Sequence, residues 1–104
     1  MAQFDVYKNP NAKTRRSIPY LVDVQSDLLD PIATRVVIPL IRISKSNQPI
    51  TRLNPNFEIE GATVLLSTAE LAGISNSALG NHVTSLKKHR TDIINALDVL
   101  ITGI

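Results

Sequence analysis

Two stretches of the sequence decide the fold: residues 20–30 read YLVDVQSDLLD, and residues 35–40 read RVVIPL. In the first stretch, Tyr20 and the two valines after it fall on every second position, which places them on one side of a strand. The second stretch opens a nearly continuous apolar run over residues 36–43, typical of a central strand that is buried on both faces. Proline donates no ladder hydrogen bond, so we expect Pro39 to interrupt this run at a bulge or an edge.

Shorter strand and loop patterns flank these two stretches. The further strands that alternation predicts are residues 3–7, 57–60 and 63–67. Gly61 separates the last two, which indicates a hairpin. Polar stretches that contain proline, residues 9–17 and 44–55, are predicted to be loops. Residues 71–81 are ambiguous, because glycines bracket a run of small residues there.

The C-terminal segment is predicted to be an amphipathic helix. Apolar residues recur there at helical spacing, namely Leu86, Ile93, Leu97 and Leu100. Ser85 is expected to cap the start, because its hydroxyl can accept from an early backbone N–H. Gly103 is expected to end the helix, since glycine adopts the left-handed conformation of a helix end. A separate polar face collects Thr91, Asn95, Asp98 and Thr102.

Length and composition describe a single domain over residues 1–104. Hydrophobic residues make up 43% of the chain and charged residues 19%, which is typical of a folded protein. Cysteine is absent, so disulfides, thiolate metal sites and thiol catalysis are excluded. The N-terminus has no signal-peptide core, and the longest apolar run, residues 36–41, is far shorter than the ~20 residues that span a bilayer. We therefore expect a cytoplasmic protein without a membrane partner.

The net charge is only +2, and the cations form two groups. These groups are Lys8, Lys13, Arg15 and Arg16 near the N-terminus, and Lys87, Lys88 and Arg90 before the helix. A nucleic-acid binder usually has a stronger basic field, so direct nucleic-acid binding is not expected. The favoured interpretation is two solvated surfaces, and the alternative is that one group receives an acidic protein partner.

The end of the first stretch carries the side chains most open to interpretation. Leu28 and Leu29 are adjacent and cannot both point inward from a regular strand, so one is expected to face a partner or a turn. Asp23, Asp27 and Asp30 could do acid–base work only if their pKa values were pushed apart. Roles in turns and caps are the favoured interpretation for these aspartates.

The sequence predicts no catalytic centre and no bound cofactor or metal. His82 and His89 are seven residues apart, which does not match the pair of ligands four residues apart that a helical zinc site uses. Phosphate-binding glycine loops, nucleophile elbows and kinase signatures are absent. The residues therefore offer no recognisable catalytic constellation.

The two opening stretches resemble the CcdB family of bacterial toxins. The likeness is strongest at residues 22–30 and 35–40 and recurs at Gln3-Phe4, Val6-Tyr7, Leu53-Asn54-Pro55, Asp92-Ile93, Ala96 and Gly103-Ile104. It implies a mainly β fold, an SH3-like β-barrel with a small three-stranded wing and a C-terminal helix, assembled as a homodimer. It also implies a type II toxin–antitoxin toxin, which is not an enzyme. Such toxins bind the A subunit of DNA gyrase, trap the gyrase–DNA cleavage complex and are neutralised by a CcdA antitoxin.

The resemblance also implies two sets of site residues. Those expected to bind gyrase are Ser26, Leu28, Leu29, Asn95, Asp98, Ile101, Thr102, Gly103 and Ile104. Those expected to bind the antitoxin are Lys8, Lys13, Arg15, Arg16, Arg42, Lys45 and Arg52. An acidic segment that folds on binding would suit the second set, because disordered segments can wrap large surfaces.

The chain departs from the family at Thr102, where some members carry tryptophan, and in residues 73–80, where some carry a proline. Tryptophan is a typical interface anchor, so Thr102 leaves two alternatives: the chain binds gyrase differently, or poisoning is weak or lost. In the second case the protein would only bind antitoxin. A further alternative is an mRNA-cleaving toxin of the MazF or Kid type, which shares the barrel fold and needs a positioned base and a cationic group.

Overall fold

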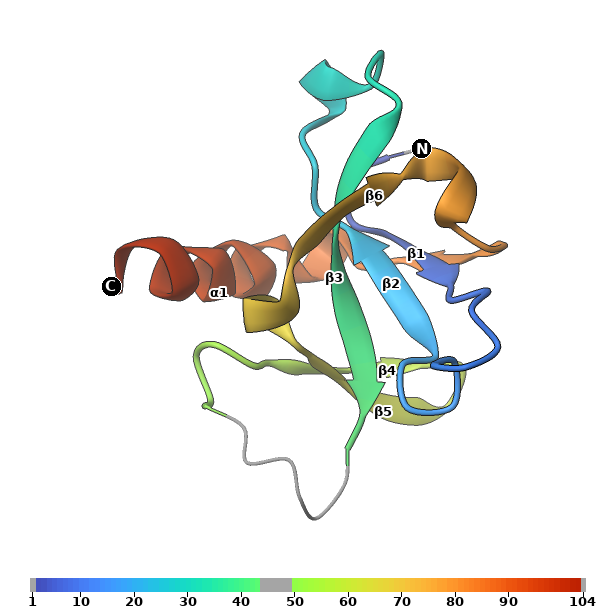
Figure 1. The fold of residues 1–104 in the computed structure, drawn as a ribbon. Coiled ribbons are helices and arrows are strands. Elements are labelled where there is room, and N and C mark those ends of the chain that lie inside the picture. Colours follow the sequence, from blue (N-terminus) through green and yellow to red (C-terminus); the bar gives the residue numbers. More distant parts are fainter. Residues whose placement is uncertain (1, 44–49, 104) are drawn as a thin grey trace.

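The fold is a curled antiparallel sheet with one C-terminal helix against it (Figure 1). The computed structural model describes residues 2–43 and 50–103. In chain order the strands are β1 (Asp5–Lys8), β2 (Tyr20–Asp23), β3 (Thr34–Arg42), β4 (Asn56–Ile59), β5 (Ala62–Leu66), β6 (Ala72–Ser75) and β7 (His82–Ser85). The helical elements are the 3₁₀ turns η1 (Asp27–Leu29), η2 (Thr68–Glu70), η3 (Asn76–Ala78) and η4 (Lys87–His89), and the α-helix α1 (Arg90–Thr102).

The long strand β3 organises the sheet. The strand order is β4-β5-β3-β2-β1-β7, and β6 also pairs with β3. β3 therefore pairs with β2 along one edge, and along its other edge with β6 and then with β5. This exchange of partners curls the sheet into a half-barrel, the mainly β architecture that the resemblance implied.

Pro39 lies inside β3, which runs through it without the predicted interruption. On one edge Pro39 is opposite Leu21 of β2. On the other edge its carbonyl accepts a hydrogen bond from the Ser67 N–H at 2.9 Å. Along that edge the partner of β3 changes here from β6, which begins opposite Val37, to β5, which ends opposite Leu40. The missing N–H of proline faces this break in the ladder, so it removes no strand-to-strand bond.

The core fills the inside of the half-barrel and is closed by α1. Every second residue of the central strands points into it, and Ile93 and Ala96 of α1 are fully buried against the same cluster. The strand residues of this cluster include Val6, Val22, Ile38, Leu40, Val64 and Leu66. No helix in the described part of the chain has the length and apolar character needed to cross a bilayer.

The predicted hairpin around Gly61 is confirmed. β4 and β5 are joined by the two residues Glu60 and Gly61, with φ of 52° and 79°. Positive φ at both central positions defines the tight turn whose twist matches that of the flanking strands. The turn directs Glu60 back toward β2, where its carboxylate meets Tyr20.

The first strand begins later than predicted, at Asp5, because Phe4 has a φ of 72°. The side chain of Phe4 is buried, which holds this uncommon backbone conformation in place. Residues 71–81, which the sequence left ambiguous, contain β6 and η3 and then connect to β7. Gly80 there donates its N–H to the Lys8 carbonyl at 2.9 Å.

The C-terminal helix ends as predicted and begins later than predicted. Gly103 has a φ of 77° and donates its N–H to the carbonyls of Asp98 and Val99. Ser85 is not its N-cap: the Ser85 hydroxyl accepts from the Lys87 N–H at 3.1 Å, at the start of η4. The chain makes this 3₁₀ turn first, and α1 starts only at Arg90.

Candidate functional site

An exposed apolar segment follows β2. Ser26 opens η1, and its hydroxyl accepts a hydrogen bond from the Leu28 N–H at 3.2 Å. The side chains of Leu28, Leu29 and Ile32 are 90%, 50% and 49% exposed. Neighbouring apolar side chains that stay in water mark contact sites for other molecules. The prediction that the two leucines do not both point inward is confirmed.

A buried ion pair supports this segment. Arg35 of β3 donates from Nε to Oδ2 of Asp23 at 2.8 Å, and its Nη2 lies 2.5 Å from the same oxygen. Nη1 of Arg35 donates to Oδ1 of Asp30, the residue that closes η1, at 3.1 Å. Burial raises the pKa of Asp23, while the hydrogen bonds from Arg35 and from the Gln25 N–H act in the opposite direction. Asp23 and Asp30 were predicted to act in turns and caps. In addition, both accept hydrogen bonds from the same buried guanidinium, that of Arg35.

Further hydrogen bonds fix η1 to the sheet. The side-chain amide of Gln25 accepts from the Val36 N–H at 3.0 Å and donates to the Leu29 carbonyl at 3.3 Å. Oδ1 of Asp27 accepts from the Gln3 N–H at 2.7 Å. The leucines are thus presented from a turn that is tied at several points.

The end of α1 carries the second half of the predicted gyrase-binding set. Asn95, Asp98 and Thr102 are exposed on one face of the helix, as the spacing predicted. Ile101 is 75% exposed, and the Thr102 hydroxyl donates to the Asp98 carbonyl at 2.7 Å. Gly103 is also exposed, and Ile104 lies outside the described residues.

The two halves of this set are separated within one chain. In Figure 1 the η1 segment lies above the centre of the sheet, whereas the C-terminal end of α1 projects to the left. The helix packs instead against η2 and η4. A partner that contacts both halves on one chain must therefore extend across the intervening surface.

The cations predicted to bind the antitoxin do not form one cluster in the structure. Lys8, Arg15 and Arg42 line one pocket, and Arg52 lies with Asp92 and Asn95 around a separate hollow of about 170 Å³. Arg52 is therefore grouped with the helix rather than with the N-terminal loop. Lys13 and Arg16 are exposed in that loop, and Lys45 lies outside the described residues.

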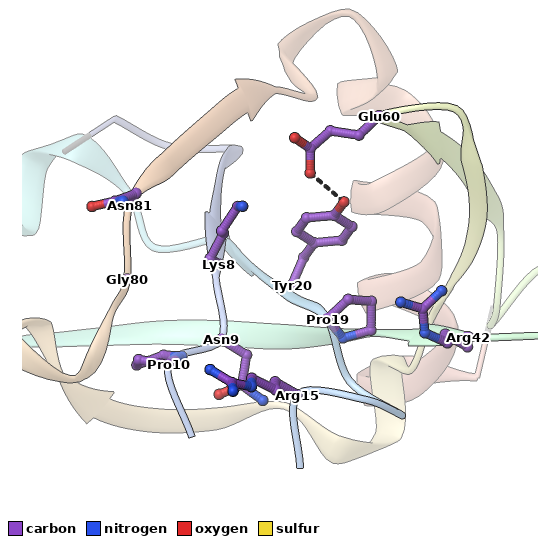
Figure 2. A pocket seen from close by; sticks show the side chains of 10 residues that line it. All are labelled: Lys8, Asn9, Pro10, Arg15, Pro19, Tyr20, Arg42, Glu60, Gly80 and Asn81. Carbon is purple, nitrogen blue, oxygen red and sulfur yellow. Dashed lines mark hydrogen bonds between the residues drawn. The ribbon is translucent and has the colours of Figure 1, made fainter. Parts of the chain in front are cut away.

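The pocket has a volume of about 550 Å³ and lies between the ends of β1, β2 and β3 (Figure 2). Its lining comprises Lys8, Asn9, Pro10, Arg15, Pro19, Tyr20, Arg42, Glu60, Gly80 and Asn81. The loop that carries Arg15 is held by Asn9, whose Nδ2 donates to the Thr14 hydroxyl at 3.0 Å and to the Ile18 carbonyl at 2.9 Å. Arg42 donates from Nε to the Arg16 carbonyl at 2.6 Å, which ties the same loop to β3.

Tyr20 and Glu60 form the acidic end of this pocket. The Tyr20 hydroxyl donates to Oε1 of Glu60 at 2.5 Å, as Figure 2 shows. Burial and then this hydrogen bond raise the pKa of Tyr20 to about 12. The phenol therefore stays protonated and neutral at physiological pH, and the pocket holds three cations against the single carboxylate of Glu60.

Sequence reasoning missed the pocket residues outside the cation set. Tyr20 was predicted only as a strand residue, and Glu60 and Gly80 had no predicted role. Glu60 lies forty residues from Tyr20 in sequence, so no local pattern joins them. Among residues 2–43 and 50–103, no three histidine, cysteine, aspartate or glutamate side chains gather as metal ligands. The arrangement can bind an anion, and it offers partners two kinds of surface, one apolar and one basic.

The fold is a small half-barrel whose surface carries an exposed apolar turn and a pocket lined by cations. The profile of the family described as CcdB protein matches residues 3–103, so the chain belongs to the CcdB family. Membership makes it a toxin of the toxin–antitoxin class. Among solved structures it is similar to an endoribonuclease in complex with its cognate antitoxin from a mycobacterial species. That likeness has a TM-score of 0.75 at 12% identity, covers 97% of this chain and 94% of the other, and shows the fold alone.

Proposed function

We propose that this protein is a bacterial cytoplasmic toxin that poisons DNA gyrase without being an enzyme itself. It would bind the A subunit, trap the gyrase–DNA cleavage complex and be neutralised by a CcdA-like antitoxin. The observation that carries the proposal is the display of Leu28, which is 90% exposed on a turn held by a hydrogen bond from Gln25 and supported by a buried ion pair. An apolar side chain on a rigid support can bury area in a partner at little cost in conformational entropy.

Thr102 offers little apolar area for contact with a partner, so other side chains must act as anchors. Its hydroxyl is bonded to the Asp98 carbonyl, so the side chain folds back onto its own helix. The apolar contact area at the helix end then comes from Ile101, which is 75% exposed. We infer that Ile101 and Leu28 take the anchoring role that tryptophan has in some family members.

A homodimer belongs to the same proposal. One chain presents η1 and the end of α1 on separated parts of its surface. Two copies would offer two helix ends and two η1 turns, and a pair of copies can match a two-fold symmetric target. Antitoxin binding is supported by the fold neighbour, which was solved with its cognate antitoxin.

The decisive experiment is a DNA cleavage assay with purified gyrase, supercoiled plasmid and ATP, with and without the protein. Linear DNA that accumulates and is released only by detergent and protease is the expected result. If no linear DNA forms at micromolar protein, the poisoning proposal is wrong, and a protein that only binds antitoxin becomes the better description.

A ribonuclease is the second candidate, because the fold neighbour is described as an endoribonuclease. The pocket supplies cations and a hydrogen-bonded Tyr20–Glu60 pair, which are groups that phosphate cleavage can use. Fold likeness does not transfer activity, so this candidate ranks below gyrase poisoning. Incubation of the purified protein with mRNA in the absence of gyrase tests it directly: cleavage would reverse the order of the two candidates.

A further inference from the structure

We propose that the pocket in Figure 2 binds a small guanine nucleotide, with the phosphate near Lys8 and Arg15 and the base at Glu60. The inference goes beyond the proposed function and depends neither on gyrase poisoning nor on RNA cleavage. It starts from the polarity of the pocket, because Arg15 and Glu60 lie at its opposite ends (Figure 2). The volume of about 550 Å³ lies within the range of roughly 300–1,000 Å³ that small-molecule sites occupy.

Lys8 and Arg15 supply the attraction for a phosphate. Within residues 2–43 and 50–103, neither side chain makes a hydrogen bond or an ion pair, although both line the pocket. A guanidinium donates two parallel hydrogen bonds to a phosphate, and a lysine adds a compact positive charge. A phosphate monoester has several terminal oxygens, so it can contact both groups at once.

Glu60 places a hydrogen-bond acceptor at the other end of the pocket. Its Oε1 accepts from the Tyr20 hydroxyl at 2.5 Å. Burial and this hydrogen bond raise the pKa of Tyr20 to about 12, so the phenol keeps its proton. An ionised carboxylate has about four lone-pair sites, and the bond from Tyr20 leaves most of them unused. A ligand group beside Glu60 must therefore donate hydrogen bonds, and an anion there is repelled.

Guanine meets the requirement at Glu60 better than the other bases. Its Watson–Crick edge carries two neighbouring donors, N1–H and the N2 amine, which match the two oxygens of a carboxylate. Adenine and cytosine each present an acceptor nitrogen beside their amine, and uracil presents a carbonyl on each side of its N–H. Acceptors placed against a carboxylate repel it, so the site is expected to reject these three bases.

The walls of the pocket suit a flat base and are formed before it binds. Pro10 and Pro19 line the pocket with apolar rings. Gly80 approaches β1 so closely that a Cβ there would lie 2.5 Å from the Lys8 carbonyl oxygen. Asn9 fixes the neighbouring loop by two side-chain hydrogen bonds. A preformed site loses less entropy on binding than one that must first be ordered.

The surroundings favour a single nucleotide over a nucleic-acid chain. The one aromatic residue of the lining, Tyr20, is only 8% exposed, so it offers no platform on which successive bases could stack. The net charge of +2 is also small for a protein that follows a phosphate backbone.

Isothermal titration calorimetry with GMP tests the inference, and AMP, guanosine and ribose 5-phosphate are the matched ligands. GMP should bind at least roughly tenfold more tightly than each of these, because each lacks the partner for one end of the pocket. Lys8→Gln and Arg15→Gln should weaken the binding of GMP and of ribose 5-phosphate by a similar factor, roughly threefold to tenfold. The control is Lys87→Gln, which removes a charge from an exposed position on η4 and should change affinity less than about twofold.

Glu60→Gln gives the sharpest readout, because it should act in opposite directions on two ligands. The glutamine oxygen can still accept from Tyr20, but the new amide group faces the donors of guanine, so GMP should bind roughly tenfold more weakly. Ribose 5-phosphate should bind more tightly, because the repelling charge is gone. Thermal unfolding of each variant confirms that it is folded.

Three outcomes would overturn the inference. If Glu60→Gln strengthens the binding of GMP and ribose 5-phosphate alike, the pocket takes any anion and the assignment of guanine is wrong. If Lys8→Gln and Arg15→Gln weaken GMP binding no more than Lys87→Gln, general surface charge holds the nucleotide. If a 5′-phosphorylated RNA oligonucleotide binds and GMP at millimolar concentration does not, the ligand is a nucleic-acid chain.

Discussion

Arg35 and Asp23 form an ion pair between β3 and β2 in which the two side chains are only 1% and 0% exposed. A buried charge is costly unless it is paired and hydrogen-bonded, so each residue depends on the other. The same guanidinium also reaches Asp30 at the end of η1. The pair therefore connects the interior of the sheet with the turn that displays Leu28.

Replacing Arg35 alone should be strongly destabilising. Arg35→Met leaves the Asp23 carboxylate buried without its counter-ion, and we expect a loss of about 3–5 kcal/mol in the free energy of unfolding. The double variant Arg35→Met with Asp23→Leu should recover much of that loss, because an apolar pair of similar volume carries no desolvation penalty. Urea unfolding of the two single variants and the double variant measures the coupling. Additive losses would show that the two charges do not depend on each other.

Gly80 and Gly73 should respond differently to the same substitution. Gly80→Ala places a methyl group 2.5 Å from the Lys8 carbonyl oxygen, so β1 or the segment before β7 must move. We expect a cost of about 1–3 kcal/mol in unfolding free energy. Gly73→Ala is the control: apart from its own chain neighbours, no residue has an atom within 4 Å of the added Cβ, so the effect should stay within about 0.5 kcal/mol. Equal effects in thermal or urea unfolding would contradict the close contact at Gly80.

Alternation and helical spacing were enough to predict most of the sheet and α1, because the core-facing residues recur at the required period. The patterns failed where a specific contact, near or distant in sequence, decides the local backbone. Phe4 delays the first strand by turning into the core with a positive φ, and the start of α1 is delayed by the turn that Ser85 stabilises. Pro39 does not break β3, because its missing N–H coincides with the change of partner from β6 to β5. No local sequence pattern encodes that change.

The candidate surfaces were predictable only in part. The polar face of α1 and the outward-facing leucine follow from spacing, and the structure confirms both exposures. The pocket joins Lys8 and Tyr20 from two strand ends with Glu60 from a hairpin turn, and such a grouping depends on strand order. Clustering of cations in the sequence therefore does not predict which of them line the pocket. Arg15 lines it, whereas Arg16, the next residue, does not.

Tyr20 should make stability depend on alkaline pH. Its pKa is raised from 10.0 to about 12 in the folded protein, chiefly by burial. Between these values the unfolded chain loses the phenolic proton while the folded chain keeps it, so the unfolded state binds fewer protons and stability falls as pH rises. The contribution is about 2 kcal/mol over this window. Urea unfolding at about pH 9.5 and about pH 11.5 should show a steeper loss for the wild type than for Tyr20→Phe. Parallel losses in the two proteins would mean that Tyr20 titrates normally.

The exposed apolar side chains should matter for gyrase and not for folding. Leu28→Ser and Ile101→Ser change side chains that are 90% and 75% exposed, so each should alter the unfolding free energy by less than about 0.5 kcal/mol. Each should raise the protein concentration needed for half-maximal DNA cleavage roughly tenfold or more, because truncating an interface anchor costs about 2 kcal/mol of binding free energy and ~1.4 kcal/mol is already tenfold.

Ile43→Ser is the matched control for these two variants. Ile43 is 48% exposed but follows the far end of β3 and lies outside both parts of the expected gyrase-binding set. The cleavage assay should therefore respond to Ile43→Ser as it does to the wild type. If all three variants reduce cleavage equally, exposed apolar area in general drives the effect. If Leu28→Ser and Ile101→Ser both leave cleavage unchanged, the toxin contacts gyrase through other residues, and the anchoring role inferred for this pair is wrong.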